Sequence, residues 1–345
     1  FAHQTFNWSN EAKSNAAVHV VIVGFASFDT TNKKIFEYEN IKAEAHEKIV
    51  KNITPYLVEG DDIVIEKRRK PICDVPNISF GSMPNDGGNF LLTDEEKEEL
   101  IKQEPLSEKY IKPLLSASEF LNGKNRWCLW LEDLNPNDLK SMSLVKQRVE
   151  NVKKLREESS REATKKLAEY PTLFGEIRQP KSEYIGIPLN TSGNRIYIPF
   201  GYFPKDFISN NTMSVVAKSS LFHFGVLTSI MHMSWIKYIC GRIKSDYRYS
   251  NELVYNNYPF PKNVSEKQKK AVEEKAQNVL NIRSQFSDCS LADLYDPFSM
   301  PPNLKKAHQE LDRAVDNCYG SKLFKNDKER IEFLFGLYEE YVSEQ

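Results

Sequence analysis

Basic and aromatic side chains alternate in the stretch 241–261, which follows a long apolar segment over residues 221–240. Its cations are Arg242, Lys244 and Arg248, and its rings are Tyr247, Tyr249, Tyr255, Tyr258 and Phe260. Cationic side chains bind DNA phosphates or guanine edges, and aromatic rings stack on bases or stiffen the surface that carries them. The pattern therefore fits a surface that contacts nucleic acid. The alternative is a helix end followed by an aromatic turn that docks one domain on the next. Chemistry alone favours this alternative, because a short basic and aromatic cluster is a weak motif.

Histidine and cysteine, the usual ligands of zinc, are scattered along the chain. The five cysteines (Cys73, Cys128, Cys240, Cys289 and Cys318) form no C-x-x-C pair and match neither a zinc site nor a disulfide framework. The six histidines are equally dispersed. We therefore predict no metal site, and reduced thiols in a cytoplasmic protein.

The bulk composition is that of a globular protein with two or three domains. The chain has 345 residues, of which 40% are hydrophobic and 28% charged, and domains commonly hold about 100 to 200 residues. No uncharged apolar run reaches the roughly 18 residues of a membrane helix, and no signal-sequence pattern opens the chain. The net charge of −1, from 47 basic and 48 acidic residues, neither supports nor opposes DNA binding.

The elements that must position these side chains follow from periodicity, caps and breakers. We expect strands at residues 16–28 and 33–39, paired as a hairpin, and further strands at 126–131, 182–188, 195–200 and 213–217. We expect helices from Thr93 onward and at 110–121, 137–170, 221–240, 265–286, 301–317 and 327–343. Strands mixed with helices, followed by helices alone, predict a mixed α/β (α+β) fold with a small, all-helical C-terminal domain.

Several blocks of the sequence resemble one family in the same order along the chain. They are FAHQTFNWSNEAKSNAAVHVVIVGF (1–25), PNISFGSMPNDGGNFLLTDEE (76–96), YIKPLLSASEFLNGKNRWCLWL (110–131), RIYIPFGYF (195–203), the stretch 241–261 and LDRAVDNCYG (311–320). Together they resemble the MmeI-like DNA methyltransferases, large single-chain enzymes that are often fused to a restriction nuclease. The resemblance implies three parts: the tail of a methyltransferase catalytic domain (1–70), a DNA target recognition domain (71–245) and a helical C-terminal domain (246–345).

The function implied by the resemblance is sequence-specific DNA recognition within an adenine-specific, S-adenosylmethionine-dependent DNA methyltransferase. The base-gripping tetrapeptide of such enzymes, Asn or Asp followed by Pro-Pro and an aromatic residue, is missing here. The glycines around residues 81–88 do not follow the strand-turn-helix order of a cofactor loop. We therefore expect the S-adenosylmethionine site and the catalytic domain, possibly with a nuclease, to lie upstream of Phe1, and the fragment to be inactive alone. Two alternatives remain: a non-catalytic DNA-specificity subunit, and a protein-interaction module without a DNA role.

Double-stranded DNA is the expected partner, and the family pattern suggests which side chains contact it. Two polar residues separated by one, just after the apolar helix, read a base pair in this family, and here they are Lys244 and Asp246. Lysine donates to guanine and aspartate accepts from cytosine, so we expect the two to read one G·C pair. The alternative is a surface ion pair of little energetic value.

Other contacts are expected from residue type. Arg242 and Arg248 are phosphate candidates, as are Lys218 and Ser219 at the start of the apolar helix, where backbone amides bind anions. Ser82, Asn85 and Asp86 lie in a loop that could reach DNA, although a purely structural turn is the commoner role. In LDRAVD, a salt bridge between packed helices accounts for Asp312, Arg313 and Asp316 as well as an activity would.

Overall fold

The N-terminal sheet has a strand order that the sequence did not predict. A computed structural model describes residues 1–8, 18–38, 43–243, 246–320 and 324–344. In it β1 (Ala2–Trp8), β2 (Val18–Val23), β3 (Lys33–Glu37) and β4 (His46–Val50) form a sheet in the order β2-β1-β3-β4. β1 is antiparallel to β2 and parallel to β3. The expected hairpin between β2 and β3 is therefore wrong, because β1, which we did not assign to a strand, lies between them.

A second sheet forms the centre of the molecule. Its strands are β5 (Ile78–Phe80), β9 (Tyr184–Pro188), β11 (Gly201–Phe203) and β13 (Met213–Ala217), in the order β11-β9-β13-β5 with antiparallel neighbours. All five residues of β9 are buried, as expected for a short continuous apolar run. β9 and β13 were predicted correctly. The strand expected at 195–200 is wrong: the chain joins the sheet only at Gly201.

A lobe with its own small sheet extends from the centre. β6 (Leu91–Leu92), β7 (Ile111–Leu115), β8 (Trp127–Leu129) and β12 (Ile208–Ser209) are ordered β12-β7-β8-β6. Its helices are α1 (Asp94–Gln103), α2 (Ala117–Asn122), α3 (Pro136–Ser141), α4 (Ser143–Glu157) and α5 (Glu162–Lys166), with 3₁₀ turns at Pro105–Tyr110 and Leu167–Glu169.

Two helix predictions in this lobe need correction. The helix expected at 110–121 is a strand followed by the short α2, because residues 111–115 pair with β8. The helix expected at 137–170 is broken at Met142 and again at 158–161. The predicted start of α1 is confirmed: Thr93 Oγ1 accepts the Glu96 N–H at 3.2 Å, and the Glu96 carboxylate accepts the Thr93 N–H at 2.9 Å.

The apolar segment 221–240 is two helices rather than one, α6 (Leu221–Thr228) and α7 (Ile230–Ile239). Ser229 between them is extended, with φ −77° and ψ 164°. The first amide of α7, on Ile230, donates at 2.7 Å to the carboxylate of Asp312 in a helix far along the chain. A side-chain oxygen that accepts a first-turn amide caps a helix, so a distant residue fixes the point where the second helix begins.

The C-terminal region is helical, as predicted. It consists of α8 (Glu266–Ser284), α9 (Leu291–Leu294), α10 (Pro302–Asp316), a 3₁₀ turn (Asn317–Tyr319) and α11 (Asp327–Ser343). Asp316 and Arg330 form a buried ion pair between α10 and α11 at 2.7 Å. The salt-bridge interpretation of LDRAVD therefore holds for Asp316, whereas Asp312 caps α7.

Two hydrophobic cores hold the chain together. The larger extends from Val58 to Tyr338 and joins the central sheet, α6 and α7 to the C-terminal helices. The smaller lies within the lobe, between Phe90 and Ile208. The larger core crosses the boundary expected between residues 245 and 246, which stays a prediction. None of the described helices combines the length and the apolar composition that a bilayer crossing needs.

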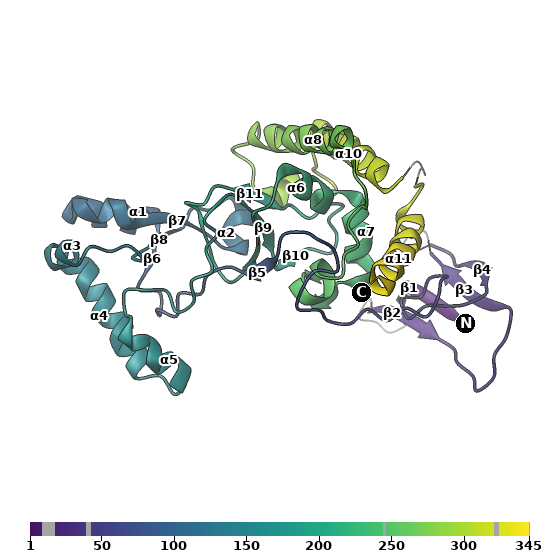
Figure 1. The fold of residues 1–345 in the computed structure, drawn as a ribbon, viewed down its shortest axis with the longest axis horizontal. Helices are drawn as coiled ribbons and strands as arrows, with labels where there is room; N and C mark the ends of the chain where they lie inside the picture. Colours follow the sequence, from purple (N-terminus) through teal and green to yellow (C-terminus); the bar gives the residue numbers. More distant parts are fainter. Residues whose placement is uncertain (9–17, 39–42, 244–245, 321–323, 345) are drawn as a thin grey trace, which may run out of the picture.

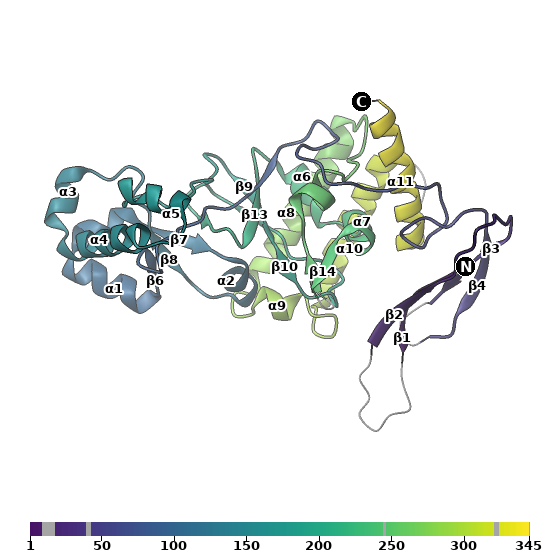
Figure 2. The ribbon, with the colours of Figure 1, turned by 90° about the horizontal axis from the view of Figure 1, so that it is seen from below.

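The parts follow one another along an elongated molecule (Figure 1). The lobe with α1, α3, α4 and α5 forms one end, and the N-terminal sheet, beside α11, forms the other. α8 and α10 lie side by side over the central part. Seen from below, the N-terminal sheet projects away from the helices (Figure 2). The mixed α/β fold class is confirmed.

Candidate nucleic-acid interface

The stretch after α7 forms a small three-stranded sheet rather than a turn. β14 (Gly241–Ile243) and β15 (Asp246–Arg248) are antiparallel, and β10 (Asn190–Thr191) pairs with the other edge of β15. Successive side chains of a strand point to opposite faces. Asp246 and Arg248 are accordingly exposed, whereas Tyr247 between them is buried. Asp246 and Arg248 therefore share one outer face of the hairpin, whereas Arg242, which pairs with Tyr247, lies on the other face.

The aromatic residues of this stretch belong to the core. Tyr247, Tyr249, Tyr255, Tyr258 and Phe260 are all at most 3% exposed. Burial raises the pKa of the hydroxyls of Tyr249, Tyr255 and Tyr258. Tyr255 donates to the Pro76 carbonyl at 2.6 Å. The rings are thus unavailable for base stacking in this conformation, whereas their burial fits the other expected role, which is to stiffen the surface that carries the cations.

The basic residues of the hairpin remain at the surface. Arg242 is exposed, and its guanidinium carbon lies 4.2 Å from the ring centroid of Tyr247. Arg248 is exposed and is fixed through its backbone, paired with Gly241 on one side and Asn190 on the other. A cation on a paired strand is well placed to meet a phosphate, since its backbone does not need to be ordered on binding.

Of the two expected base-reading residues, Lys244 lies outside the described residues. Asp246 is exposed, and its Oδ1 accepts the backbone N–H of Gly193 at 3.2 Å. This contact attaches the loop 191–195 to the hairpin. Arg195 in that loop donates to Thr191 Oγ1. Burial lowers the pKa of Arg195, and the carboxylates of Asp246 and Asp296 oppose that shift. We did not foresee the contact between this loop and the hairpin, although the dipeptide Ser192-Gly193 is typical of a turn.

The start of α6 is occupied by protein groups. Lys218 is exposed, with a positive φ of 57°. Ser219 is buried, and its hydroxyl donates to the Val216 carbonyl at 2.8 Å. The Ser220 amide donates to the His223 ring at 3.2 Å. The Ser219 hydroxyl and the Ser220 amide are therefore engaged within the protein, whereas the Lys218 ammonium is exposed, and the phosphate role of Lys218 and Ser219 stays a prediction.

The loop that contains Ser82, Asn85 and Asp86 has a structural role. Ser82 is fully buried, and its hydroxyl accepts the Arg178 N–H at 3.0 Å. Asp86 is 4% exposed, and its carboxylate accepts two backbone N–H groups of the following turn, at 3.1 and 2.6 Å. Asn85 adopts a positive φ of 48°. Ser82 and Asp86 are thus unavailable to DNA in this conformation, and the turn interpretation applies to both.

Arg156, which the sequence did not single out, holds this loop in place. Its side chain is fully buried and donates to five backbone carbonyls at 2.8 to 3.1 Å, on Pro84, Asn85, Leu167, Tyr170 and Leu173. Burial lowers the pKa of the Arg156 guanidinium, and the Asp86 carboxylate opposes that shift. The neighbours of Arg156 in the sequence are mostly charged, and such a segment predicts exposed side chains. Its burial is therefore visible only in the folded structure.

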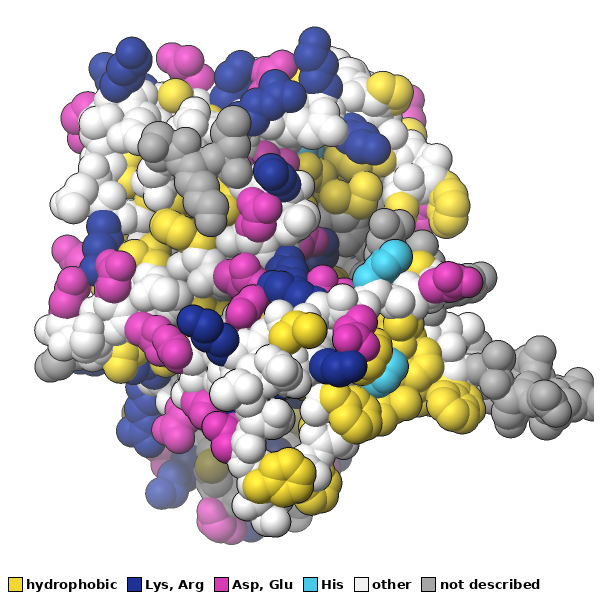
Figure 3. All heavy atoms as spheres, turned by 90° about the vertical axis from the view of Figure 1, so that its right-hand side faces the viewer, with side chains coloured by type: hydrophobic (Ala, Val, Ile, Leu, Met, Phe, Trp, Pro, Cys, Tyr) yellow, Lys and Arg dark blue, Asp and Glu magenta, His cyan; other side chains and the backbone are white. Residues whose placement is uncertain are grey.

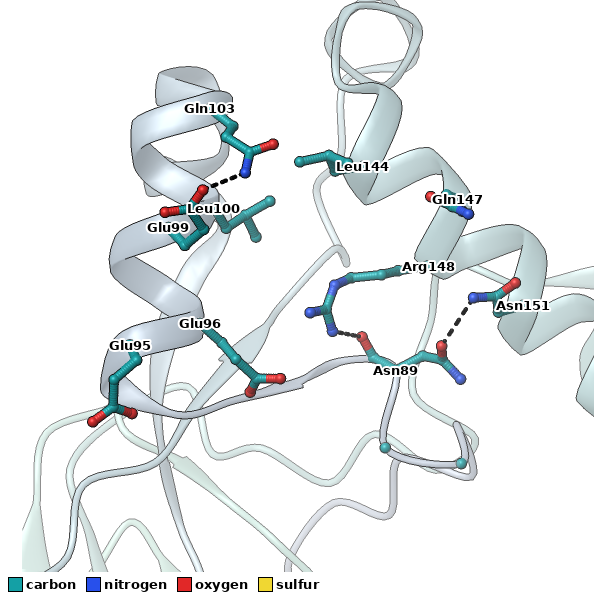
Figure 4. A pocket seen from close by; sticks show the side chains of 12 residues that line it. Asn89, Glu95, Glu96, Glu99, Leu100, Gln103, Leu144, Gln147, Arg148 and Asn151 are labelled. Carbon is teal, nitrogen blue, oxygen red and sulfur yellow. Dashed lines mark hydrogen bonds between the residues drawn. The ribbon is translucent and has the colours of Figure 1, made fainter.

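An open cavity of about 700 Å³ separates α1 from α4 (Figure 4). Arg148 of α4 lies on one side of this cavity and donates to the Asn89 carbonyl at 2.8 Å. The other side is lined by three carboxylates of α1, those of Glu95, Glu96 and Glu99. Carboxylates repel phosphates, so we do not place the DNA backbone there. Among the described residues no three potential metal ligands gather.

The N-terminal sheet exposes apolar side chains (Figure 3). On β2 and the segment after it, the exposed fractions are 50% for Val21, 54% for Val23, 96% for Phe25 and 76% for Phe28. A contiguous apolar surface of this kind marks a contact with further protein or another partner.

Comparison with known proteins decides the family. The sequence model of the MmeI target recognition domain matches residues 59–262, more than half of the 345 residues. This chain belongs to the MmeI family. Models of the MmeI C-terminal domain and of the MmeI DNA-methyltransferase domain match residues 264–344 and 1–37. The resemblance noted in the sequence is confirmed.

Two relatives show how much of such a protein is present. DNA methyltransferase A of Bacillus subtilis (strain 168) is 41% identical over 341 residues, which are 99% of this chain and 38% of that protein. The structure of the type IIL restriction-modification enzyme MmeI in complex with DNA is 44% identical, with a TM-score of 0.85 over 99% of this chain and 46% of that one. The chain thus spans less than half of each relative.

Proposed function

We propose that this chain is the DNA-reading part of a site-specific, S-adenosylmethionine-dependent DNA methyltransferase. The observation that carries the proposal is the hairpin β14–β15. It lies within the last part of the match to the target recognition domain and exposes Asp246 and Arg248. A relative 44% identical to this chain was solved in complex with DNA.

The roles of the site residues follow from their chemistry. Lys244 and Asp246 read one G·C pair, with lysine donating to guanine and the free carboxylate oxygen of Asp246 accepting from the cytosine amine. Arg242, Arg248 and Lys218 hold phosphates. Because Asp246 Oδ1 already accepts the Gly193 N–H, the carboxylate reaches DNA in a fixed orientation.

The remaining chemistry belongs to the parent enzyme. We propose that it methylates adenine and that its cofactor site lies outside residues 1–345. Close packing accounts for two of the glycines in residues 81–88: a Cβ on Gly81 would lie 2.2 Å from the Asn210 carbonyl oxygen, and one on Gly87 would lie 2.6 Å from Leu155. The fragment alone is then inactive. The exposed apolar side of β2 supports a division in which residues 1–70 complete the catalytic domain, 71–245 read DNA and 246–345 buttress them. A DNA substrate implies a cytoplasmic location.

The test is selection of the full-length enzyme and of this chain on randomised duplex DNA at two salt concentrations. We expect a short enriched motif that contains a G·C pair. The double exchange Lys244→Glu with Asp246→Arg should invert the preference at that one position. An unchanged motif would refute the assignment of these two residues. Absence of salt-sensitive binding by both proteins would favour a protein-interaction module instead.

A methyl-transfer assay of the full-length enzyme tests the other alternative, a non-catalytic specificity subunit. A non-catalytic specificity subunit would select the same motif and yet transfer no methyl group unless a separate catalytic chain is added.

A further inference from the structure

The loop 191–195 is attached to the hairpin at its first residue and at its middle. Thr191 belongs to β10 and pairs with Tyr247 of β15. Gly193 donates its N–H to Asp246 Oδ1 at 3.2 Å. Arg195 donates back to Thr191 Oγ1, which closes the loop on itself. The loop and the hairpin therefore form one rigid surface element.

Asn194 lies at the tip of this element. Its backbone N–H donates to Ser192 Oγ at 3.3 Å, which fixes the turn. Its side chain is exposed, and no hydrogen bond joins its amide group to another described residue. The residue before it touches Asp246, and the residue after it is a cation. Asn194 thus lies in the chain between the residue that Asp246 holds and a cation, and its exposed amide group is available to a partner.

We infer that Asn194 is a further specificity-determining residue, which contacts the base pair next to the one read by Asp246. The inference rests on the proposed function of the hairpin. The asparagine side chain has a donor and an acceptor side by side, which match N7 and the N6 amine of adenine in the major groove. The expected partner is an adenine. The same geometry makes Asp246 a positioning residue for the loop, because its carboxylate holds Gly193.

The experiment uses the full-length enzyme, since DNA must be held by all of its domains. Wild type, Asn194→Asp and Asn194→Ala are each selected on a duplex library randomised over the recognition site. Asn194→Asp keeps the size of the side chain but removes the donor. Asn137→Asp is the matched control, because Asn137 is an exposed asparagine on α3 in the lobe.

Both Asn194 variants should lose the preference for adenine at one position by about 5- to 150-fold, the range of one bidentate base contact. The position next to it, assigned to Asp246, should keep its G·C preference, and Asn137→Asp should match wild type. A wild-type motif that persists unchanged in both Asn194 variants would overturn this inference and leave the proposed function standing.

Two other outcomes separate the remaining possibilities. Equal weakening on all sequences, with a smaller salt dependence, would make Asn194 a backbone contact and would also overturn the inference. A wild-type enzyme that enriches no motif at all would refute the proposed function itself.

Discussion

Replacing Asp312 by asparagine should remove a large pH dependence from the stability of this fold. Asp312 Oδ2 accepts the Tyr197 hydroxyl and Oδ1 accepts the Ile230 N–H, both at 2.7 Å. Burial raises the pKa of the Asp312 carboxyl from its ordinary value of 3.8 to about 7, although both hydrogen bonds act in the opposite direction. The desolvation of the buried carboxylate thus destabilises the charged form more than the two hydrogen bonds stabilise it.

The sign follows from proton binding. Between pH 3.8 and about 7 the folded chain binds a proton at Asp312 that the unfolded chain has released. Stability from this group is therefore complete below pH 3.8 and is lost as the pH rises to about 7. The loss amounts to about 1.4 kcal/mol for each pH unit, or roughly 4 kcal/mol in all. Asparagine keeps an acceptor for the Ile230 N–H and does not ionise.

The pH dependence of the wild-type stability also contains an opposite contribution, from three buried histidines. Burial lowers the pKa of His223 and His232 to about 4 and that of His308 to about 3. These imidazoles remain neutral in the fold, so their contribution to stability is lost as the pH falls below their ordinary value of 6.5. The difference between wild type and Asp312→Asn cancels the histidines and isolates the carboxyl group.

The assay is urea unfolding of both proteins at intervals between pH 5 and pH 8, compared as a difference in unfolding free energy. The unfolding free energy of Asp312→Asn, relative to that of wild type, should rise steadily from pH 5 to pH 7 and then stay constant. Glu310→Gln is the control on the same helix, since the Lys275 partner keeps the pKa of Glu310 below its usual range. If the difference in unfolding free energy between Asp312→Asn and wild type stayed constant across this interval, the raised pKa of the Asp312 carboxyl would be refuted.

Three further changes test other parts of the molecule. Arg156→Met should destabilise the lobe by more than about 3 kcal/mol, since each buried carbonyl left without a donor costs about 1 to 3 kcal/mol. Hydrogen exchange in residues 84–90 measures it, with Arg148→Met, which loses one bond, as the milder control. Gly81→Ala should cost about 1 to 3 kcal/mol in thermal unfolding, because its Cβ would meet a backbone oxygen at 2.2 Å, whereas Gly241→Ala, with nothing within 4 Å, should be neutral. Arg248→Ala in the full-length enzyme should weaken binding equally on all duplexes and lower the salt slope by about 1. A sequence-dependent loss would contradict its phosphate role.

Local sequence signals determined the ends of many helices and the family of the chain. The Thr93 cap fixes the start of α1, and the predicted bounds 213–217 and 327–343 coincide with β13 and α11. Caps and periodicity act over a few residues, so they are visible in the sequence. The stretch that contains Asp246 and Arg248 was also found this way, because its charges are local.

Only the tertiary structure decided which side chains of the candidate site face outward. The tyrosines of the hairpin stretch are buried because α7 and the C-terminal helices pack around them. Asp312 caps α7 at Ile230 from 82 residues away. Asp246 meets Gly193 across 53 residues, and Arg156 reaches Pro84 across 72. Such contacts depend on how distant segments pack, and no propensity of a short segment encodes them. The sequence therefore identified the chemistry of the interface, whereas the fold selected the side chains that remain free to carry it out.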